Sequence, residues 1–243
     1  MGTEQDIYIH ELDFHHVIQP IFDLSKNNIY GYEVLLRSQE IQNPEILFNY
    51  AKEKNQLFEL DMRSILSACE NFNKNSSLLS GLYIFINVFP STLINPDFYE
   101  RMQRLANVMS LRPESIVFEI NESEKGTDMQ ALKTGISAIK RLGFLVALDD
   151  IGKGESTVQS IVQLEPNIAK LDRIFAKDLT KSPKKQSIIT MILQLLGKDT
   201  IFIVEGFESE ADLLTAKGLG VPFGQGFFLG KPKPLNHYLA NFE

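Results

Sequence analysis

Short segments rich in β-branched, aliphatic and aromatic residues recur along the whole chain, each bounded by polar or turn-forming residues. Such segments are typical of buried β-strands. We predict eight strands, at Val17–Asp23, Ile29–Arg37, Leu82–Val88, Ile116–Ile120, Phe144–Asp149, Ile168–Asp172, Thr200–Glu205 and Phe223–Leu229. Between most of them, apolar residues recur at helical spacing. The clearest predicted helices are Leu57–Phe72, Phe98–Met109, Met129–Leu142, Gln186–Leu196 and Glu208–Ala216.

Strands that alternate with helices predict a largely parallel sheet covered on both faces. The first two strands differ, because only Ser25-Lys26-Asn27-Asn28 separates them and a parallel crossover needs a longer connection. We therefore expect an antiparallel hairpin there. Eight strands favour a modified TIM-like (βα)8 barrel with an antiparallel N-terminal strand over an open doubly wound sheet. With no break in composition, residues 1–243 are expected to form a single domain with its core at about residues 14–235.

Composition narrows the classes of function. Apolar residues make up 44% of the chain and the formal net charge is −7, which argues against binding of long nucleic acids but permits a small anionic ligand in a local cationic or metal-containing pocket. Cys69 is the only cysteine, which excludes an internal disulfide and a multi-cysteine zinc site. Met1–His10 does not resemble a signal peptide, and no apolar run is long enough to insert into a membrane. These features predict a cytoplasmic protein.

Polar side chains stand at or near the C-terminal ends of the predicted strands. They are Asn87, Glu119, Asp149, Asp150, Asp172 and Glu205, and Glu33 lies inside a further strand. A single acid at such a position is commonly the N-cap of the next helix. In a barrel, however, the C-terminal ends of the strands form one mouth, where active sites are built. The recurrence predicts that these side chains converge.

Five carboxylates brought together would repel one another strongly unless cations compensate. Oxygen ligands from Asp, Glu and Asn suit Mg²⁺ or Mn²⁺, whereas zinc more often binds His or Cys. Three of the four histidines precede the first predicted strand and His237 lies near the C-terminus, so we interpret them as surface residues. A pair of divalent cations is an arrangement that supports phosphodiester hydrolysis. Lys170, near Asp172, is a candidate for holding the attacking water or the phosphate.

Several motifs resemble, in order along the chain, those of the EAL phosphodiesterase family. The first is Tyr32-Glu33-Val34-Leu35-Leu36-Arg37, with valine in place of the alanine that gives the family its name. The others are Ile86-Asn87-Val88, Phe118-Glu119-Ile120-Asn121-Glu122-Ser123, Leu148-Asp149-Asp150-Ile151-Gly152, Ala169-Lys170-Leu171-Asp172-Arg173, Val204-Glu205-Gly206-Phe207-Glu208 and Gly224-Gln225-Gly226. Together they extend over nearly the whole chain.

The resemblance implies a phosphodiesterase specific for cyclic di-GMP, which opens it to linear pGpG with two Mg²⁺ or Mn²⁺ ions. Inhibition by Ca²⁺ is also expected, because Ca²⁺ is larger and tolerates looser coordination than Mg²⁺. It implies Glu33, Asn87, Glu119 and Asp149 as ligands of one metal, and Asp149, Asp150 and Glu205 as ligands of the other. Lys170 matches the family's catalytic lysine, and Glu205 its proton acceptor. Glu122 and Glu208 match acids that support the catalytic residues, while Gln19, Arg37, Gln225 and Asp172 match substrate-binding positions. A homodimer is also implied.

The main departure from the family is the loop Asp149–Thr157, where Lys153 replaces a threonine and Glu155 replaces an aromatic residue. Both glycines of the loop are kept, which favours an unchanged backbone path. We expect the altered side chains to affect closure of the loop, the rate of turnover and the dimer surface. An active enzyme is our main hypothesis. A catalytically silent cyclic di-GMP receptor or protein-interaction module is the alternative, and a barrel hydrolase for another phosphodiester is a third possibility.

Overall fold

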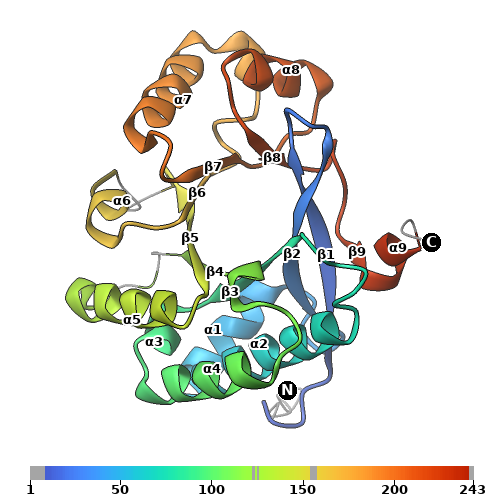
Figure 1. Cartoon of the computed structure of the whole chain (residues 1–243), viewed down its shortest axis with the longest axis vertical. Coiled ribbons are helices and arrows are strands. Elements are labelled where there is room, and N and C mark those ends of the chain that lie inside the picture. The colour runs from blue at the N-terminus through green and yellow to red at the C-terminus, as the bar shows by residue number, and fades with distance from the viewer. Residues whose placement is uncertain (1–8, 122–123, 125, 154–157, 241–243) are drawn as a thin grey trace, which may run out of the picture.

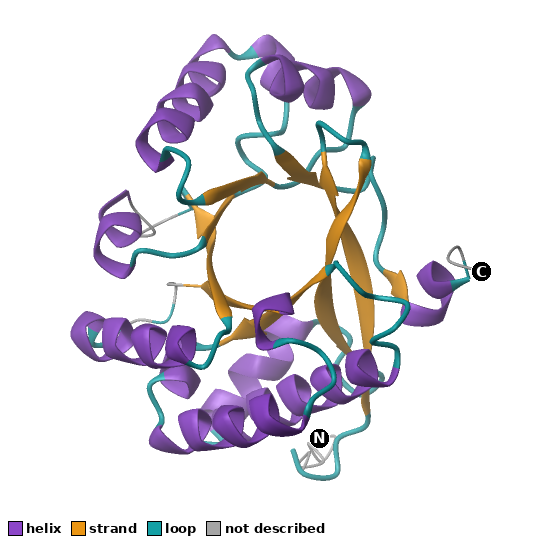
Figure 2. Cartoon of the chain, in the orientation of Figure 1, coloured by secondary structure: helices purple, strands orange, loops and turns teal. Residues whose placement is uncertain are grey.

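The computed structural model describes residues 9–121, 124, 126–153 and 158–240. Nine strands form one sheet: β1 Phe14–Asp23, β2 Asn28–Ser38, β3 Tyr83–Val88, β4 Ile116–Asn121, β5 Leu145–Ile151, β6 Ile168–Leu171, β7 Ile201–Val204, β8 Phe223–Gln225 and β9 Lys233–Pro234. Strands β2 to β8 are parallel to their neighbours in sequence order, and β1 closes the ring by pairing antiparallel with both β8 and β2. Figure 2 shows this ring of strands with helices outside it. The predicted barrel with its antiparallel first strand is confirmed.

The N-terminal hairpin is held by its turn. The Asp23 carboxylate accepts hydrogen bonds from the backbone N–H groups of Ser25 and Lys26, each at 3.0 Å, and Asn27 has a φ of 55°, a conformation that asparagine tolerates in turns. In the resulting register, Gln19 of β1 pairs with Glu33 of β2. The hairpin therefore brings two predicted site residues side by side.

Helices cover the outer surface of the barrel (Figure 1). They are α1 Pro44–Glu53, α2 Leu57–Lys74, α3 Pro90–Leu93, α4 Pro96–Val108, α5 Met129–Arg141, α6 Val158–Leu164, α7 Pro183–Leu196, α8 Glu210–Gly218 and α9 Leu235–Leu239. Side chains of Asn95, Asp128, Ser182 and Ser209 accept hydrogen bonds from backbone N–H groups in the first turns of α4, α5, α7 and α8. These N-caps fix where the helices begin.

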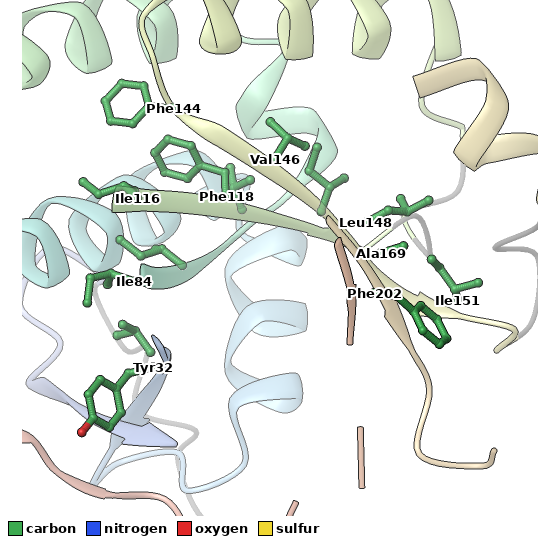
Figure 3. Close-up of a cluster of buried hydrophobic side chains, with 14 of the residues drawn as sticks. Tyr32, Ile84, Ile116, Phe118, Phe144, Val146, Leu148, Ile151, Ala169 and Phe202 are labelled. Atoms are coloured by element: carbon green, nitrogen blue, oxygen red, sulfur yellow. The ribbon is translucent and has the colours of Figure 1, made fainter. Parts of the chain in front are cut away.

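The main hydrophobic core lies between the barrel and its helices. It includes Phe118, Phe144, Val146 and Phe202, each at most 2% exposed, and Figure 3 shows such side chains projecting from neighbouring strands. Within the described residues, no helix combines the length and apolar character needed to cross a membrane.

Most predicted boundaries shift by one to three residues, and three of the differences have a clear physical or functional meaning. The eighth strand ends at Gln225 rather than Leu229, because the chain turns at Gly226, whose carbonyl accepts from the N–H groups of Leu229 and Gly230. A side chain at Gly226 would lie 2.2 Å from the backbone nitrogen of Phe207. The first strand begins at Phe14 and therefore contains His15 and His16, which were predicted to precede it. Helix α8 begins at Glu210 rather than Glu208, because Ser209 caps it.

Candidate metal and phosphodiester site

Inward-facing residues of the barrel form two layers with opposite chemistry. The lower layer is apolar and consists of Ile21, Phe85, Val117, Ala147, Ile168 and Ile203. Side chains on a strand alternate between its two faces, so the residue two positions away faces inward again. In the direction of the mouth, those residues are Gln19, Asn87, Glu119, Asp149, Lys170 and Glu205. Strand alternation thus produces a polar layer directly above an apolar floor.

Lys170 lies at the centre of this polar layer. Its ammonium Nζ is 2.5 Å from Glu119 Oε1, 2.6 Å from Glu205 Oε1, 3.4 Å from Asp149 Oδ1 and 3.6 Å from Glu33 Oε2. The side chains of Lys170 and Glu119 are fully buried, and that of Glu205 is 18% exposed. One cation therefore faces four carboxylates, which leaves an excess of negative charge when all are ionised.

This imbalance shifts the pKa values of the cluster. Burial raises the pKa of Glu119 well above its usual range and also raises that of Asp149, and in both cases Lys170 offsets only part of the effect. Burial raises the pKa of Glu205 to about 8. Burial alone would lower the pKa of Lys170, but the surrounding carboxylates outweigh it and raise that pKa. Without a further cation, these buried carboxyl groups therefore release their protons at higher pH than exposed carboxyl groups do.

Neighbouring polar groups hold the outer carboxylates in place. Gln225 Nε2 donates to Glu33 Oε2 at 2.6 Å, and Asn87 Nδ2 lies 3.4 Å from Glu33 Oε1. Asp150 has a φ of 55°, which is uncommon for a residue other than glycine. This conformation accompanies a hydrogen bond of 2.7 Å from Asn121 Nδ2 to Asp150 Oδ2.

The donor set fits divalent cations. Asp149, Asp150 and Glu205 each offer a carboxylate oxygen, and these oxygens lie within 4.8 Å of one another. Among the described residues, neither oxygen of Glu119 nor Asp149 Oδ1 accepts a hydrogen bond of regular geometry. Buried carboxylate oxygens with free lone pairs and unbalanced charge are suited to hard cations such as Mg²⁺ and Mn²⁺. All six predicted metal ligands thus lie around one mouth.

Three cavities open around this cluster. The inner cavity, of 180 Å³, is lined by Gln19, Glu33, Glu205, Gln225 and Phe227 among others. The groove, of 750 Å³, is lined by Glu33, Arg37, Phe48, Asp61 and Asn87 among others. The outer cavity, of 950 Å³, lies between the loops after β6 and β7 and is lined by Asp172, Arg173, Lys177, Glu208 and Asp212 among others.

The predicted substrate-binding and supporting residues are distributed over these cavities. Gln19 Nε2 donates to Gly230 O at 3.0 Å, and Arg37 Nη1 to Leu36 O at 2.7 Å. The Asp172 carboxylate accepts from the backbone N–H of Ile174 at 2.8 Å and so also stabilises its own turn. Glu208 is exposed between the inner and outer cavities. Glu122 and Glu155 lie outside the described residues.

Sequence reasoning missed Asp61. This residue of α2 is 1% exposed, lines the groove and accepts a hydrogen bond of 2.9 Å from the backbone N–H of Phe89. Burial raises its pKa to about 7 despite that hydrogen bond. Its position among Leu57, Leu60 and Ile65, on the apolar face of a predicted helix, was the available signal, because acids are rarely buried.

Asp61→Asn is expected to remove part of the pH dependence of stability. The folded protein holds the Asp61 proton up to about pH 7, whereas an unfolded aspartate releases it at about pH 3.9. The folded state therefore binds more protons over this range, and its stability falls as the pH rises. Asparagine keeps the acceptor for Phe89 but cannot ionise, so the variant should gain roughly 2–4 kcal/mol over the wild type at pH 8 and little at pH 4.

Urea unfolding at both pH values measures this difference. Asp199→Asn, which changes an exposed carboxylate, is the matched control. Its free energy of unfolding should change with pH as that of the wild type does. If the free energy of unfolding changed equally with pH in Asp61→Asn and the wild type, the assignment of a proton to buried Asp61 would be wrong.

Comparison with known proteins places this architecture and site in a family. The profile of the EAL domain matches residues 4–232. The chain belongs to the EAL domain family. It is 28% identical over 237 residues to a cyclic di-GMP phosphodiesterase of Pseudomonas aeruginosa, covering 96% of this chain and 39% of that protein. This EAL domain spans only 21% to 43% of the length of such curated relatives.

Solved structures agree with the fold of this EAL domain. An EAL domain protein from Listeria monocytogenes superposes with a TM-score of 0.85 at 23% identity, covering 98% of each chain. A Klebsiella pneumoniae protein, solved as a calcium and cyclic di-GMP complex, gives a TM-score of 0.82 at 22% identity, covering 96% of this chain and 58% of that one. The family, predicted from motifs, is confirmed by the profile match, and these structures agree with the barrel fold.

Proposed function

We propose that this EAL domain is a metal-dependent phosphodiesterase that hydrolyses cyclic di-GMP to linear pGpG. The observation that carries the proposal is the buried cluster of Lys170 with four carboxylates, adjacent to Asp150, at the mouth of the barrel. Curated relatives named as cyclic di-GMP phosphodiesterases support the choice of substrate. The groove, at 750 Å³, lies within the range of sites that hold small organic ligands.

Two Mg²⁺ or Mn²⁺ ions are the proposed cofactors. Glu33, Asn87, Glu119 and Asp149 would hold one ion, and Asp149, Asp150 and Glu205 would hold the other. Bound there, the ions would supply the positive charge that activates water and stabilises charge developing on phosphorus. The added charge would also lower the raised pKa values of the carboxyl groups.

The protein's own residues have distinct proposed roles. Lys170 keeps the carboxylates assembled as an internal counter-ion and presents a fixed positive charge towards the reacting phosphate. Glu205, which is partly exposed to the inner cavity, is positioned to take a proton from water at its carboxylate once it is ionised. Gln225 orients Glu33, while Arg37 offers a guanidinium in the groove, where directional hydrogen bonds to a phosphate are favourable. A homodimer and a cytoplasmic location remain predictions from the sequence.

Incubation of the purified protein with cyclic di-GMP and Mn²⁺, followed by chromatography of the products, tests the proposal. Formation of pGpG that a chelator abolishes is the expected result. Binding of cyclic di-GMP without pGpG would instead select the receptor, an alternative that the altered Asp149–Thr157 loop favours. Cleavage of a generic phosphodiester, with none of cyclic di-GMP, would contradict both.

Replacing Mn²⁺ by Ca²⁺ is expected to preserve binding of cyclic di-GMP while suppressing its hydrolysis by about 10²-fold or more. Ca²⁺ is larger than Mg²⁺ and tolerates looser coordination, so it can neutralise the carboxylates without enforcing the geometry of the reaction. Calorimetry in Ca²⁺ and product formation in each metal measure the two effects separately. Equal rates in Ca²⁺ and Mg²⁺ would rule out a geometry-sensitive metal site.

A further inference from the structure

A lysine side chain is already paired with one of the proposed metal ligands. Lys153 Nζ lies 3.2 Å from Asp150 Oδ2, with the lysine side chain 64% exposed and the aspartate 20% exposed. Asn121 donates to the same oxygen at 2.7 Å. Asp150 offers a carboxylate oxygen to a group of three potential metal ligands, together with Asp149 and Glu205. Lys153 is therefore a positive charge at a site suited to a cation.

The backbone holds Lys153 close to Asp150. The N–H of Lys153 donates to Asp150 O at 3.0 Å, which closes a turn. Within this turn, Gly152 has a φ of 90°, and a side chain there would lie 2.4 Å from the ring of Phe175. The packing of Gly152 on Phe175 thus fixes the turn, and the turn keeps the ammonium within reach of the carboxylate. This is a tethered ion pair rather than a chance contact between distant segments.

The two donors to Asp150 differ in their effect on a metal ion. Asn121 is neutral and can remain beside a metal ligand, whereas the charge of Lys153 repels a second cation. An exposed ion pair is weak, so Lys153 can be displaced. The presence of Lys153 therefore raises the metal concentration needed to fill the site, but it does not prevent a metal ion from binding.

We propose that Lys153 is a tethered counter-ion of Asp150 and that it sets the metal affinity of the site. The Lys153 ammonium must leave the Asp150 carboxylate before a divalent cation can bind there. The inference rests on the proposed metal site and adds a residue that determines its occupancy. A variant with an uncharged residue at this position would bind metal at lower metal concentrations.

Direct binding of Mn²⁺, measured by calorimetry on the purified protein without substrate, tests this role. Lys153→Met should bind Mn²⁺ about threefold to tenfold more tightly than the wild type, and Lys153→Arg, which keeps the charge, should bind like the wild type. Lys177→Met is the matched control, because Lys177 lines the outer cavity and forms no ion pair with a carboxylate in the described part of the chain. Its affinity should not change.

Unchanged affinity in Lys153→Met would overturn the proposal, as would an equal gain in Lys177→Met, which would indicate a general effect of net charge. Asp149→Asn separates this failure from failure of the proposed function. If Asp149→Asn abolishes Mn²⁺ binding while Lys153→Met leaves it unchanged, the metal site stands and Lys153 has no role in it. If Asp149→Asn binds Mn²⁺ like the wild type, the metal site itself is wrong.

Discussion

Lys170→Met is expected to destabilise the metal-free protein by about 3–5 kcal/mol at pH 8 and to reduce hydrolysis by at least roughly 10²- to 10³-fold. The lysine is fully buried and lies within 3.6 Å of four carboxylates. Without its charge these groups must either repel one another or take up protons. Because burial raises the pKa values of Glu119 and Asp149, protonation is easier at pH 5, and the destabilisation should be smaller there.

Urea unfolding in the presence of a chelator at pH 5 and pH 8 measures this loss of stability. Lys184→Met removes an exposed lysine from α7 and should leave both stability and turnover unchanged. Adding Glu119→Gln to Lys170→Met removes one of the carboxylates that have lost their counter-ion. The double variant should therefore recover part of the stability but none of the activity. Wild-type stability of Lys170→Met at pH 8 would show that the cluster does not depend on this cation.

Asp149→Asn is expected to lower hydrolysis by roughly 10³-fold or more while the protein stays folded. Asp149 belongs to both proposed sets of metal ligands, so its loss weakens the binding of both ions at once. In the metal-free protein the same change relieves repulsion within the cluster. The free energy of unfolding at pH 8 should therefore stay within about 1 kcal/mol of the wild type or rise.

Turnover of cyclic di-GMP and chelator-treated urea unfolding, carried out on the same preparation, measure both parts of this expectation. Asp178→Asn is the matched control, since Asp178 pairs with Lys181 at 3.5 Å on an exposed loop. It should keep wild-type activity. Retention of near-normal turnover and metal dependence by Asp149→Asn would refute the assigned metal centre.

Much of the barrel was predictable because its strands are short, continuously apolar and separated by helical stretches. The hairpin followed from a four-residue turn. Helix starts were placed less well, although Asn95 before Pro96 and Ser182 before Pro183 are recognisable caps. The end of β8 was missed because it depends on the packing of Gly226 against Phe207, a contact between distant segments.

The convergence of the site residues was predictable for a related reason. Once a closed barrel is inferred, strand alternation places Glu119, Asp149 and Glu205 on the same inward-facing layer. The sequence did not indicate that Lys170 would contact four carboxylates at once, because that depends on the diameter of the barrel and on side-chain rotamers. Asp61 and the Lys153–Asp150 pair were missed because burial and turn geometry, rather than residue type, give them their significance.

The reversed direction of β1 determines where the chain enters the barrel. Phe14, its first residue, pairs with Ser38 at the mouth end of β2, and His15 pairs with Arg37. In a barrel with only parallel strands, the chain would enter at the opposite face. A segment joined ahead of Phe14 therefore arrives at the face of the barrel that carries the carboxylate-lined mouth. The residues just ahead of β1 are anchored at this face, because Ile9 and Leu12 are buried against Leu36, Leu47 and Leu60.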